Sequence, residues 1–224
     1  MKWFVYKWTQ GSGPTPPSVL LSSPQAGNHE VGDTINVVLN ASYTKHTNNI
    51  AGITYHQDGA SIQTWSIGPW SGTDSYTQSG VTSNIPTTFN FDAKATDVNS
   101  LSGTSNVVQV NFEPMTYRGS NAVDSLLEAD ILALANSRLS SNRIGNYLFS
   151  MALGTYKYIC YPTVLGLIPD PTSDIIDMGT GFPVPFQLQV GTISVTNSFG
   201  VTLDYNVYRS INILGWAQNL RITI

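Results

Sequence analysis

The sequence predicts an all-β protein made of two β-sandwich domains. Three observations carry this prediction: short segments alternate apolar and polar residues, β-branched and aromatic side chains are enriched in them, and Gly, Pro, Asn or Asp bounds them. A chain of 224 residues is long enough for two ordinary domains, since domains commonly run to about 100–150 residues. We therefore divide it into residues 1–18, 19–113 and 114–224.

Residues 1–18 predict an N-terminal arm followed by a linker. Large apolar side chains dominate the arm, at Trp3, Phe4, Tyr6 and Trp8, and a segment rich in Gly and Pro follows it. So short a segment cannot bury these side chains in a core of its own. We expect the arm to add as a strand either to its own domain or to a sheet edge of a neighbouring subunit, and the linker favours the neighbour.

Residues 19–113 predict a β-sandwich, because roughly seven strands fit this length and no helical stretch interrupts them. Asp58-Gly59 supplies the tight turn of a hairpin. The expected strands are Val19–Leu21, Thr34–Asn40, Ile53–Gln57, Ser61–Trp65, Thr87–Thr96 and Asn106–Phe112. The arrangement resembles immunoglobulin-like modules, particularly those of phage tail and capsid proteins, although the Cys…Trp…Cys spacing of antibody domains is absent.

One short helix is predicted near residues 124–135, after Pro114 marks the joint between the domains. Asp124 or Ser125 can cap its first turn, and Asn136 ends it. Its apolar positions recur at helical spacing. They are Leu126, Leu127, Ile131 and Leu134. We expect this helix to plug the open end of the second sandwich.

The rest of the chain predicts a compact β module. Its expected strands are Tyr147–Gly154, Thr155–Pro162, Phe182–Gln189, Thr192–Asn197, Val201–Tyr208 and Leu220–Ile224. Three patterns stand out: Tyr-x-Tyr-x-x-Tyr-Pro at 156–162, Val-Thr-Asn-x-x-Gly at 195–200 and Tyr-x-Val-Tyr-x-Ser at 205–210. With Gly181–Phe186, they resemble the carboxy-terminal β-domain of structural proteins of tailed-bacteriophage virions. The resemblance implies a virion part and carries no catalytic signature.

The charge of the chain is low and dispersed. Charged residues make up 11% of the sequence, against roughly 25% in an average soluble protein. The net charge is −4, and the ten Lys and Arg residues form no cluster of the kind that binds phosphates. We expect no nucleic-acid binding. Partner subunits would cover part of this weakly charged surface; the alternative is a β-rich composition of extracellular style.

Residues suited to catalysis are scarce. His29 and His46 are expected in loops and His56 in a strand, where satisfied or solvated imidazoles are the favoured interpretation. The common hydrolase, P-loop and dinucleotide-binding motifs are missing, so we expect no enzyme and no cofactor. Cys160 is the single cysteine, which rules out an intrachain disulfide and a zinc site built from thiolates. We expect it to be buried and inert.

An acidic segment, Asp170 to Asp177, is the one candidate for a metal site. Three carboxylates fall within eight residues, but Ile175 occupies the position at which an EF-hand loop needs glycine. We therefore favour a plain acidic loop and expect no bound metal.

A glycan-binding surface is the remaining candidate site. Trp65, Trp70 and Tyr76 lie in or beside a loop rich in Gly, Pro and Ser, and aromatic side chains of this kind can stack on a sugar ring. The alternative, which we favour, places Trp65 in the core and packs Trp70 against its own domain.

Together these features predict a non-enzymatic structural protein of a tailed-phage virion, from a tail, neck, baseplate or fibre. We expect it to form a homo-oligomer, to contact other virion proteins and to be located in the virion. Lys7 interrupts the apolar N-terminus, and no run of about 20 apolar residues occurs, so neither a signal peptide nor a membrane span is expected. The alternative function is an adhesin module that recognises a bacterial surface glycan.

Overall fold

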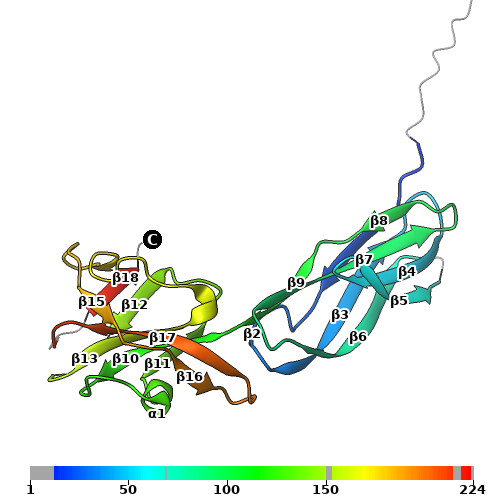
Figure 1. The fold of residues 1–224 in the computed structure, drawn as a ribbon. Coiled ribbons are helices and arrows are strands. Elements are labelled where there is room, and N and C mark those ends of the chain that lie inside the picture. Colours follow the sequence, from blue (N-terminus) through cyan, green and yellow to red (C-terminus); the bar gives the residue numbers. More distant parts are fainter. Residues whose placement is uncertain (1–12, 69, 150–152, 214–217, 223–224) are drawn as a thin grey trace, which may run out of the picture. The chain divides into compact units, whose positions relative to one another are not determined.

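The computed structural model describes residues 13–68, 70–149, 153–213 and 218–222 (Figure 1). Eighteen β-strands, one α-helix and one 3-10 helix lie within these ranges, so the prediction of an all-β fold is confirmed. The described chain divides into two compact units. The first unit comprises the described part of Met1–Gly27 with Ile35–Val81 and Thr88–Val110, and the second comprises Asn28–Thr34, Thr82–Thr87 and the described part of Asn111–Ile224. The domain boundaries at 19–113 and 114–224 stay predictions of where independent folding begins and ends.

Two antiparallel sheets build the first half of the chain. One has the order β1-β3-β6, and the other has the order β2-β9-β7-β4-β5, with β8 also paired to β7. Their bounds are β1 Ser18–Ser22, β2 Gly27–Glu30, β3 Thr34–Thr44, β4 Ile50–Gln57, β5 Ala60–Ser66, β6 Gly72–Thr82, β7 Thr87–Asp97, β8 Ser102–Thr104 and β9 Val108–Glu113. In immunoglobulin-like sandwiches, strands A, B and E share one sheet and C, F and G the other. Here β1, β3 and β6 correspond to A, B and E, and β4, β7 and β9 correspond to C, F and G. The immunoglobulin-like architecture is therefore confirmed.

Alternation along the strands places the core between these two sheets. The alternating pattern of Thr87–Thr96 predicts that Phe89, Phe91, Ala93 and Ala95 point inward; the last three are fully buried, and Phe89 is partly buried. The predicted hairpin turn joins β4 to β5, and both Asp58 and Gly59 have the positive φ angles that such a turn requires.

Three strands in this region, β2, β6 and β8, were not predicted. The longest, β6, occupies Gly72–Thr82, where we expected a loop continuing to Tyr76. Its sequence is almost entirely Gly, Ser, Thr, Asp and Gln, and even an inward residue, Asp74, is polar. Apolar alternation is therefore absent although the backbone is extended, because β6 meets the core through hydrogen bonds as well as apolar contacts.

The second unit contains a six-stranded and a three-stranded sheet. The larger has the order β11-β10-β13-β17-β15, with β16 paired to β17, and the smaller has the order β12-β18-β14. Their bounds are β10 Met115–Asn121, β11 Asn136–Leu139, β12 Gly145–Phe149, β13 Tyr156–Pro162, β14 Ile175–Asp177, β15 Phe186–Leu188, β16 Ile193–Thr196, β17 Thr202–Ser210 and β18 Gln218–Ile222. The 3-10 helix spans Thr163–Leu165 and follows β13 directly.

Strand β13 lies between two hydrophobic cores. Ile159 and Tyr161 point into the core shared with the three-stranded sheet, which also includes Phe186 and Leu220. Tyr158 and Cys160 point into the core on the opposite face of the six-stranded sheet. Because both faces of β13 are covered, it is a nearly continuous buried run, typical of a central strand.

The predicted helix lies within the expected range but is shorter, and it covers a sheet face where we expected it to plug an end. Helix α1 spans only Glu128–Leu132, not 124–135, and begins at Leu127 without a side-chain cap from Asp124 or Ser125. Leu126, Ile131 and Leu134 belong to the core on the face of the six-stranded sheet, so the helical segment covers that face and does not plug an end. Leu127 remains exposed.

Two competing interactions explain the short helix. The side chain of Gln189 accepts a hydrogen bond from the Leu126 backbone N–H at 3.0 Å and donates one to the Leu126 carbonyl at 3.1 Å, which removes this residue from helical pairing. At the other end, Asn136 enters β11 and pairs with Arg118 of β10. Tertiary pairing therefore overrides the helical pattern at both ends.

Two leucines in the β1-β3-β6 sheet test the assignment of the core. Leu39 of β3 is fully buried, whereas Leu20 of β1 is 63% exposed. We expect Leu39→Ala to lower the free energy of unfolding by about 2–5 kcal/mol, because it leaves a cavity. We expect Leu20→Ala to change it by less than about 0.5 kcal/mol. Urea denaturation measures both, and equal effects would contradict the placement of the core.

Candidate functional site

Trp65, the first of the three aromatic candidates, is on strand β5 at the edge of the larger sheet of the first unit. It pairs in register with Ile53 of β4. Residues directly opposite each other in an antiparallel pair share a face. Ile53 is fully buried, yet Trp65 is 44% exposed. The indole therefore lies on the inward face of β5 but outside the closed core.

Trp70 lies in the connection between β5 and β6 and is 70% exposed. The ammonium group of Lys45 is 4.8 Å from the ring centroid, a cation–π contact. The Lys45 backbone N–H donates to Ser71 Oγ at 2.8 Å, and its Nζ donates to Asn49 at 2.7 Å. The bond to Ser71 and the contact with Trp70 hold the connection against the loop between β3 and β4, and the bond to Asn49 lies within that loop.

Tyr76 is on β6 and points toward the opposite sheet. Its ring centroid lies 5.6 Å from that of the fully buried Tyr55 of β4, and its hydroxyl donates to Gln78 at 2.7 Å. The Tyr55 hydroxyl in turn donates to Asp74 of β6 at 2.9 Å. Burial is the main cause of the raised pKa of Tyr55, and its bond to Asp74 adds to it.

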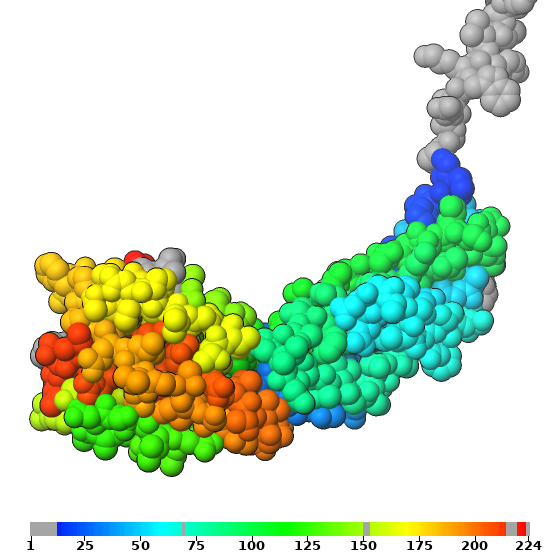
Figure 2. Space-filling view, in the orientation of Figure 1, coloured from blue at the N-terminus to red at the C-terminus, as the bar shows by residue number. Residues whose placement is uncertain are grey.

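The three candidates therefore sit in different surroundings. Among the described residues, no ring contact joins Trp65, Trp70 and Tyr76. Neither indole is buried, so the interpretation that places Trp65 in the core is wrong. In the space-filling view, the cyan to teal surface that includes β5 and β6 lies uncovered on the face of the first unit in view (Figure 2). Glycan binding by these side chains stays a prediction.

The predicted assembly arm precedes the part of the chain that the structure describes. Trp3, Phe4, Tyr6 and Trp8 lie outside the described residues. The described chain begins at Gly13, within the linker.

Each of the three histidines lies near a polar side chain. His29 lies in β2, not in a loop as predicted, and its Nδ1 is 3.8 Å from Asp33. His46 Nε2 is 3.3 Å from Ser18 Oγ, and His56 Nδ1 is 2.9 Å from Asp92.

The acidic segment makes its own turn. Asp170 accepts hydrogen bonds from the backbone and hydroxyl of Thr172 and from the Ser173 hydroxyl, and these bonds lower its pKa. Its backbone N–H donates to Asp174 at 2.8 Å. Within the part of the chain that the structure describes, no group of three His, Cys, Asp or Glu residues is arranged to hold a metal ion. The same part contains no helix that is long and apolar enough to cross a membrane.

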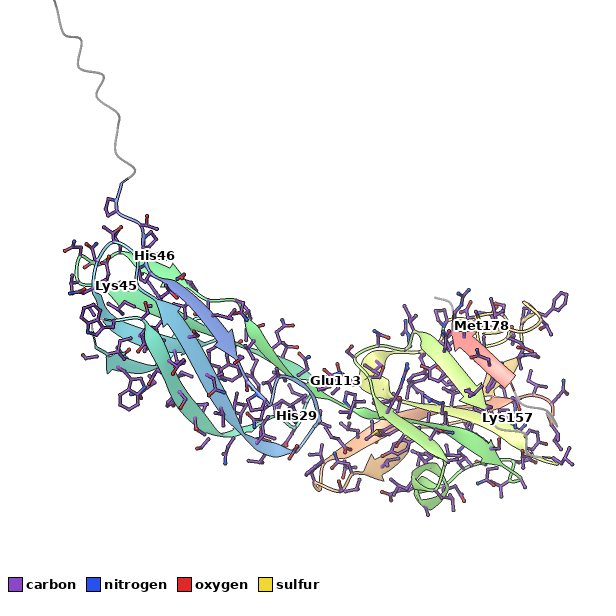
Figure 3. The ribbon with its side chains drawn as sticks, turned by 180° about the vertical axis from the view of Figure 1, so that it is seen from behind. His29, Lys45, His46, Glu113, Lys157 and Met178 are labelled. Atoms are coloured by element: carbon purple, nitrogen blue, oxygen red, sulfur yellow. The ribbon has the colours of Figure 1, made fainter. Side chains whose placement is uncertain are left out.

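Two buried titratable groups lie on β13. Cys160 is buried as predicted, and burial raises the pKa of its thiol. Lys157, labelled in Figure 3, is fully buried, and its Nζ donates to Ser120 at 2.9 Å. Burial lowers the pKa of this lysine. Both side chains are fully buried within the second unit.

An arginine and tyrosine cluster in the second unit was not found from the sequence. The guanidinium carbons of Arg118 and Arg138 lie 5.2 and 5.0 Å from the ring centroid of Tyr147. Arg118 Nε and Nη1 and Arg138 Nε are buried without a hydrogen-bond partner among the described residues. Burial lowers the pKa of Arg118, and the like charge of Arg138 lowers it further.

Hydroxyl groups connect this cluster to the chain around it. Tyr147 donates to the Arg143 carbonyl at 3.0 Å and accepts a bond from Arg138 at 3.3 Å. Tyr161 donates to the same carbonyl at 2.8 Å and also contacts the Tyr147 hydroxyl. Burial is the largest cause of the raised pKa of Tyr161. The cluster joins β10, β11 and β13 of one sheet to β12 of the other through cation–π contacts and hydrogen bonds, so it is suited to holding the two sheets together.

Comparisons with known proteins yield distant likenesses alone. No protein-family model matches the sequence, and no curated protein does. Among solved structures, the chain is similar to a fibronectin(III)-like module of Clostridium thermocellum CbhA, with 19% identity, 42% of this chain and 93% of that chain covered, and a TM-score of 0.33.

Two further structures show the same degree of likeness. One is the PKD domain of an M14-like peptidase from Thermoplasmatales archaeon SCGC AB-540-F20, with 21% identity, 46% of this chain and 99% of that chain covered, and a TM-score of 0.31. The other is the CARDB domain of the PF1109 protein from Pyrococcus furiosus, in complex with di-metal ions, with 10% identity, 49% and 99% covered, and a TM-score of 0.30. At these values the likenesses carry no conclusion about function.

The tyrosine network gives a stability prediction. We expect Tyr147→Phe to lower the free energy of unfolding by about 1–3 kcal/mol, because it removes a buried hydroxyl bonded to an arginine and to a carbonyl. The control is Tyr76→Phe, whose half-buried hydroxyl bonds one side chain and whose loss we expect to cost less than about 1 kcal/mol. Urea denaturation measures both. A Tyr147→Phe variant as stable as the parent would show that the network does not join the sheets.

Proposed function

We propose that this chain is a non-enzymatic structural component of a tailed-phage virion, from a tail, neck, baseplate or fibre, which assembles in several copies through its β-domains and its N-terminal arm. The observation that carries the proposal is the set of three sequence patterns in the second unit. They fall on the central strand β13, on the turn from β16 to β17 and on β17 itself. They therefore occupy positions that determine the architecture of the unit.

Exposed apolar side chains support an assembling role. Val190 is fully exposed, and Leu153, Phe182 and Leu127 are more than 70% exposed. Single exposed apolar residues are ordinary on any protein. Several strongly exposed apolar side chains on a chain with few charges favour the burial of these side chains against other subunits. Other virion proteins and further copies of the chain are the partners that we propose.

The buried titratable groups are consistent with a structural role. Most of those with perturbed pKa values are tyrosines, and Asp97, Arg118, Lys157 and Cys160 are others. The contacts given for these groups serve packing and hydrogen bonding. None of these contacts pairs a nucleophile with a general base, which is the arrangement that covalent catalysis needs.

Antibody labelling of particles tests this proposal. We expect an antibody raised against residues 114–224 to label tailed particles banded from a lysate of cells that carry the gene, and to detect the chain in those particles after denaturation. The control antibody is raised against an abundant host protein, and that protein should be depleted from the same band. If the chain stays with the soluble host proteins, the virion proposal is wrong.

The exposure of two indoles favours a second candidate function, glycan recognition by an adhesin module. Trp65 and Trp70 are both accessible, and aromatic rings of this kind bind the apolar faces of sugars. We expect Trp70→Ala to abolish retention on a panel of lipopolysaccharide, teichoic acid and capsular polysaccharide without lowering the thermal midpoint. The matched control is Phe182→Ala, another exposed aromatic residue. A parent protein that binds no member of the panel would exclude this function for those glycans.

A further inference from the structure

On one side of the first unit, one sheet extends one strand further than the other. Strand β6 is the last strand of its sheet, and β5 is the last strand of the other. Tyr76 and Asp74 of β6 contact Tyr55, so β6 lies over β4. Strand β5 is one position beyond β4. The inward face of β5 therefore extends past β6, and no described strand lies opposite it.

Trp65 lies on the part of β5 that has no described strand opposite it. Trp65 shares its face with Ile53. The exposure of the two side chains differs because β6 covers β4, while no described element covers β5 to the same degree. Ile53 is fully buried, and Trp65 is 44% exposed. A strand added beside β6 would lie about 4.8 Å from it and would face Trp65 across the sandwich.

The edges on this side carry few of the devices that prevent strand addition. Native edge strands are commonly protected by lysine, proline or short length. Strand β6 has eleven residues and β5 has seven, and neither contains lysine, arginine or proline. Asp74 is the single charged residue of the two strands, and it accepts the hydrogen bond from Tyr55. These edges are therefore suited to pairing with another strand.

The N-terminal arm has the sequence that such a strand needs. In an extended conformation, Phe4, Tyr6 and Trp8 fall on one face and Trp3, Val5 and Lys7 on the other. The aromatic face would cover β5 and Trp65. The other face would continue the exposed hydroxyl row of β6, which is solvated.

The linker meets the sandwich at the end where β6 begins. The Thr15 N–H donates to Thr47 Oγ1 at 2.8 Å, and the adjacent Lys45 N–H donates to Ser71 Oγ at 2.8 Å, one residue before β6. Figure 3 shows Lys45 and His46 at this end of the first unit. Twelve residues precede the described chain, enough to supply a strand of six and a short spacer.

The direction of the linker favours a neighbouring copy as the acceptor. Pro14, Pro16 and Pro17 fix their φ angles and stiffen the backbone. Figure 1 shows the first described residues continuing beyond the ends of the strands of this unit. To reach its own β6, the chain would have to reverse direction within Gly11–Gly13.

We infer that the β6 edge of one copy accepts residues 3–8 of a neighbouring copy as an added strand, with Phe4, Tyr6 and Trp8 packed over Trp65 and the inward face of β5. This inference rests on the proposed assembly of several copies. It identifies the surface that receives the arm, and backbone hydrogen bonds to β6 together with the aromatic contacts provide the affinity.

Disulfide trapping between two differently tagged full-length copies tests the inference. One copy carries Lys7→Cys, and the other carries Thr73→Cys, Ser75→Cys or Thr77→Cys, on the exposed face of β6. After mixing and oxidation, we expect a linked pair of unlike tags for at least one of the three positions, because the Cβ atoms must come within about 4.5 Å. The control pairs Lys7→Cys with Ser22→Cys, on β1 at the far edge of the same sheet, and should give no linked pair.

Two results would overturn the inference. A disulfide that forms only when Lys7→Cys and the β6 cysteine are in the same copy would show that the arm folds back on its own unit. No disulfide at any β6 position would show that the arm does not pair with this edge. The native Cys160 is buried and serves as the unreactive background.

Light scattering of the full chain provides an independent measurement. We expect Trp65→Ala to weaken self-association about tenfold or more, and deletion of residues 1–13 to abolish it, while Leu20→Ala, on β1 at the far edge of the β1-β3-β6 sheet, leaves it unchanged. A multimer that survives both Trp65→Ala and the deletion would overturn the inference and leave the virion proposal standing. Absence of the chain from purified particles would overturn the virion proposal whatever the trapping shows.

Discussion

A β-strand has two faces and two edges, and covering each of them is the constraint on which both units depend. Strand β13 meets it completely: β10 and β17 pair with its edges, one core covers Ile159 and Tyr161, and another covers Tyr158 and Cys160. The helical segment around α1 is needed because the outer face of the six-stranded sheet is apolar. On the open side of the first unit, β5 and β6 meet the same constraint only in part, and this is where we place the arm of a neighbouring copy.

Polar side chains take over backbone pairing where strands are interrupted. Asn106, between β8 and β9, accepts a hydrogen bond from the Leu21 N–H at 2.9 Å and donates to the Leu21 carbonyl at 3.0 Å. Gln189 does the same for Leu126 in the second unit. An amide side chain offers both a donor and an acceptor, so it can replace one residue of a neighbouring strand. The many Asn and Gln residues in a chain with few charges thus have a structural use.

The candidate sites show how far residue spacing predicts contact. The sequence drew attention to Trp65, Trp70 and Tyr76 because they are close together along the chain, but the first and the last lie on strands of different sheets, β5 and β6. Arg118 and Arg138, in contrast, are far apart along the chain and meet at one tyrosine ring. Their contact depends on the pairing of β10 with β11 and on the approach of β12, and no local pattern encodes these.

The sequence by itself determined the features that depend on neighbouring residues: the all-β class, the alternation of β7, the Asp58-Gly59 turn and the burial of Cys160. Tertiary structure decided the rest. Strand β6 is polar because its inward side chains bond to the opposite sheet, and α1 is short because Gln189 and β10 compete for its ends. Which edges remain open followed only from the order of the strands, since an edge is defined by the neighbour that a strand lacks.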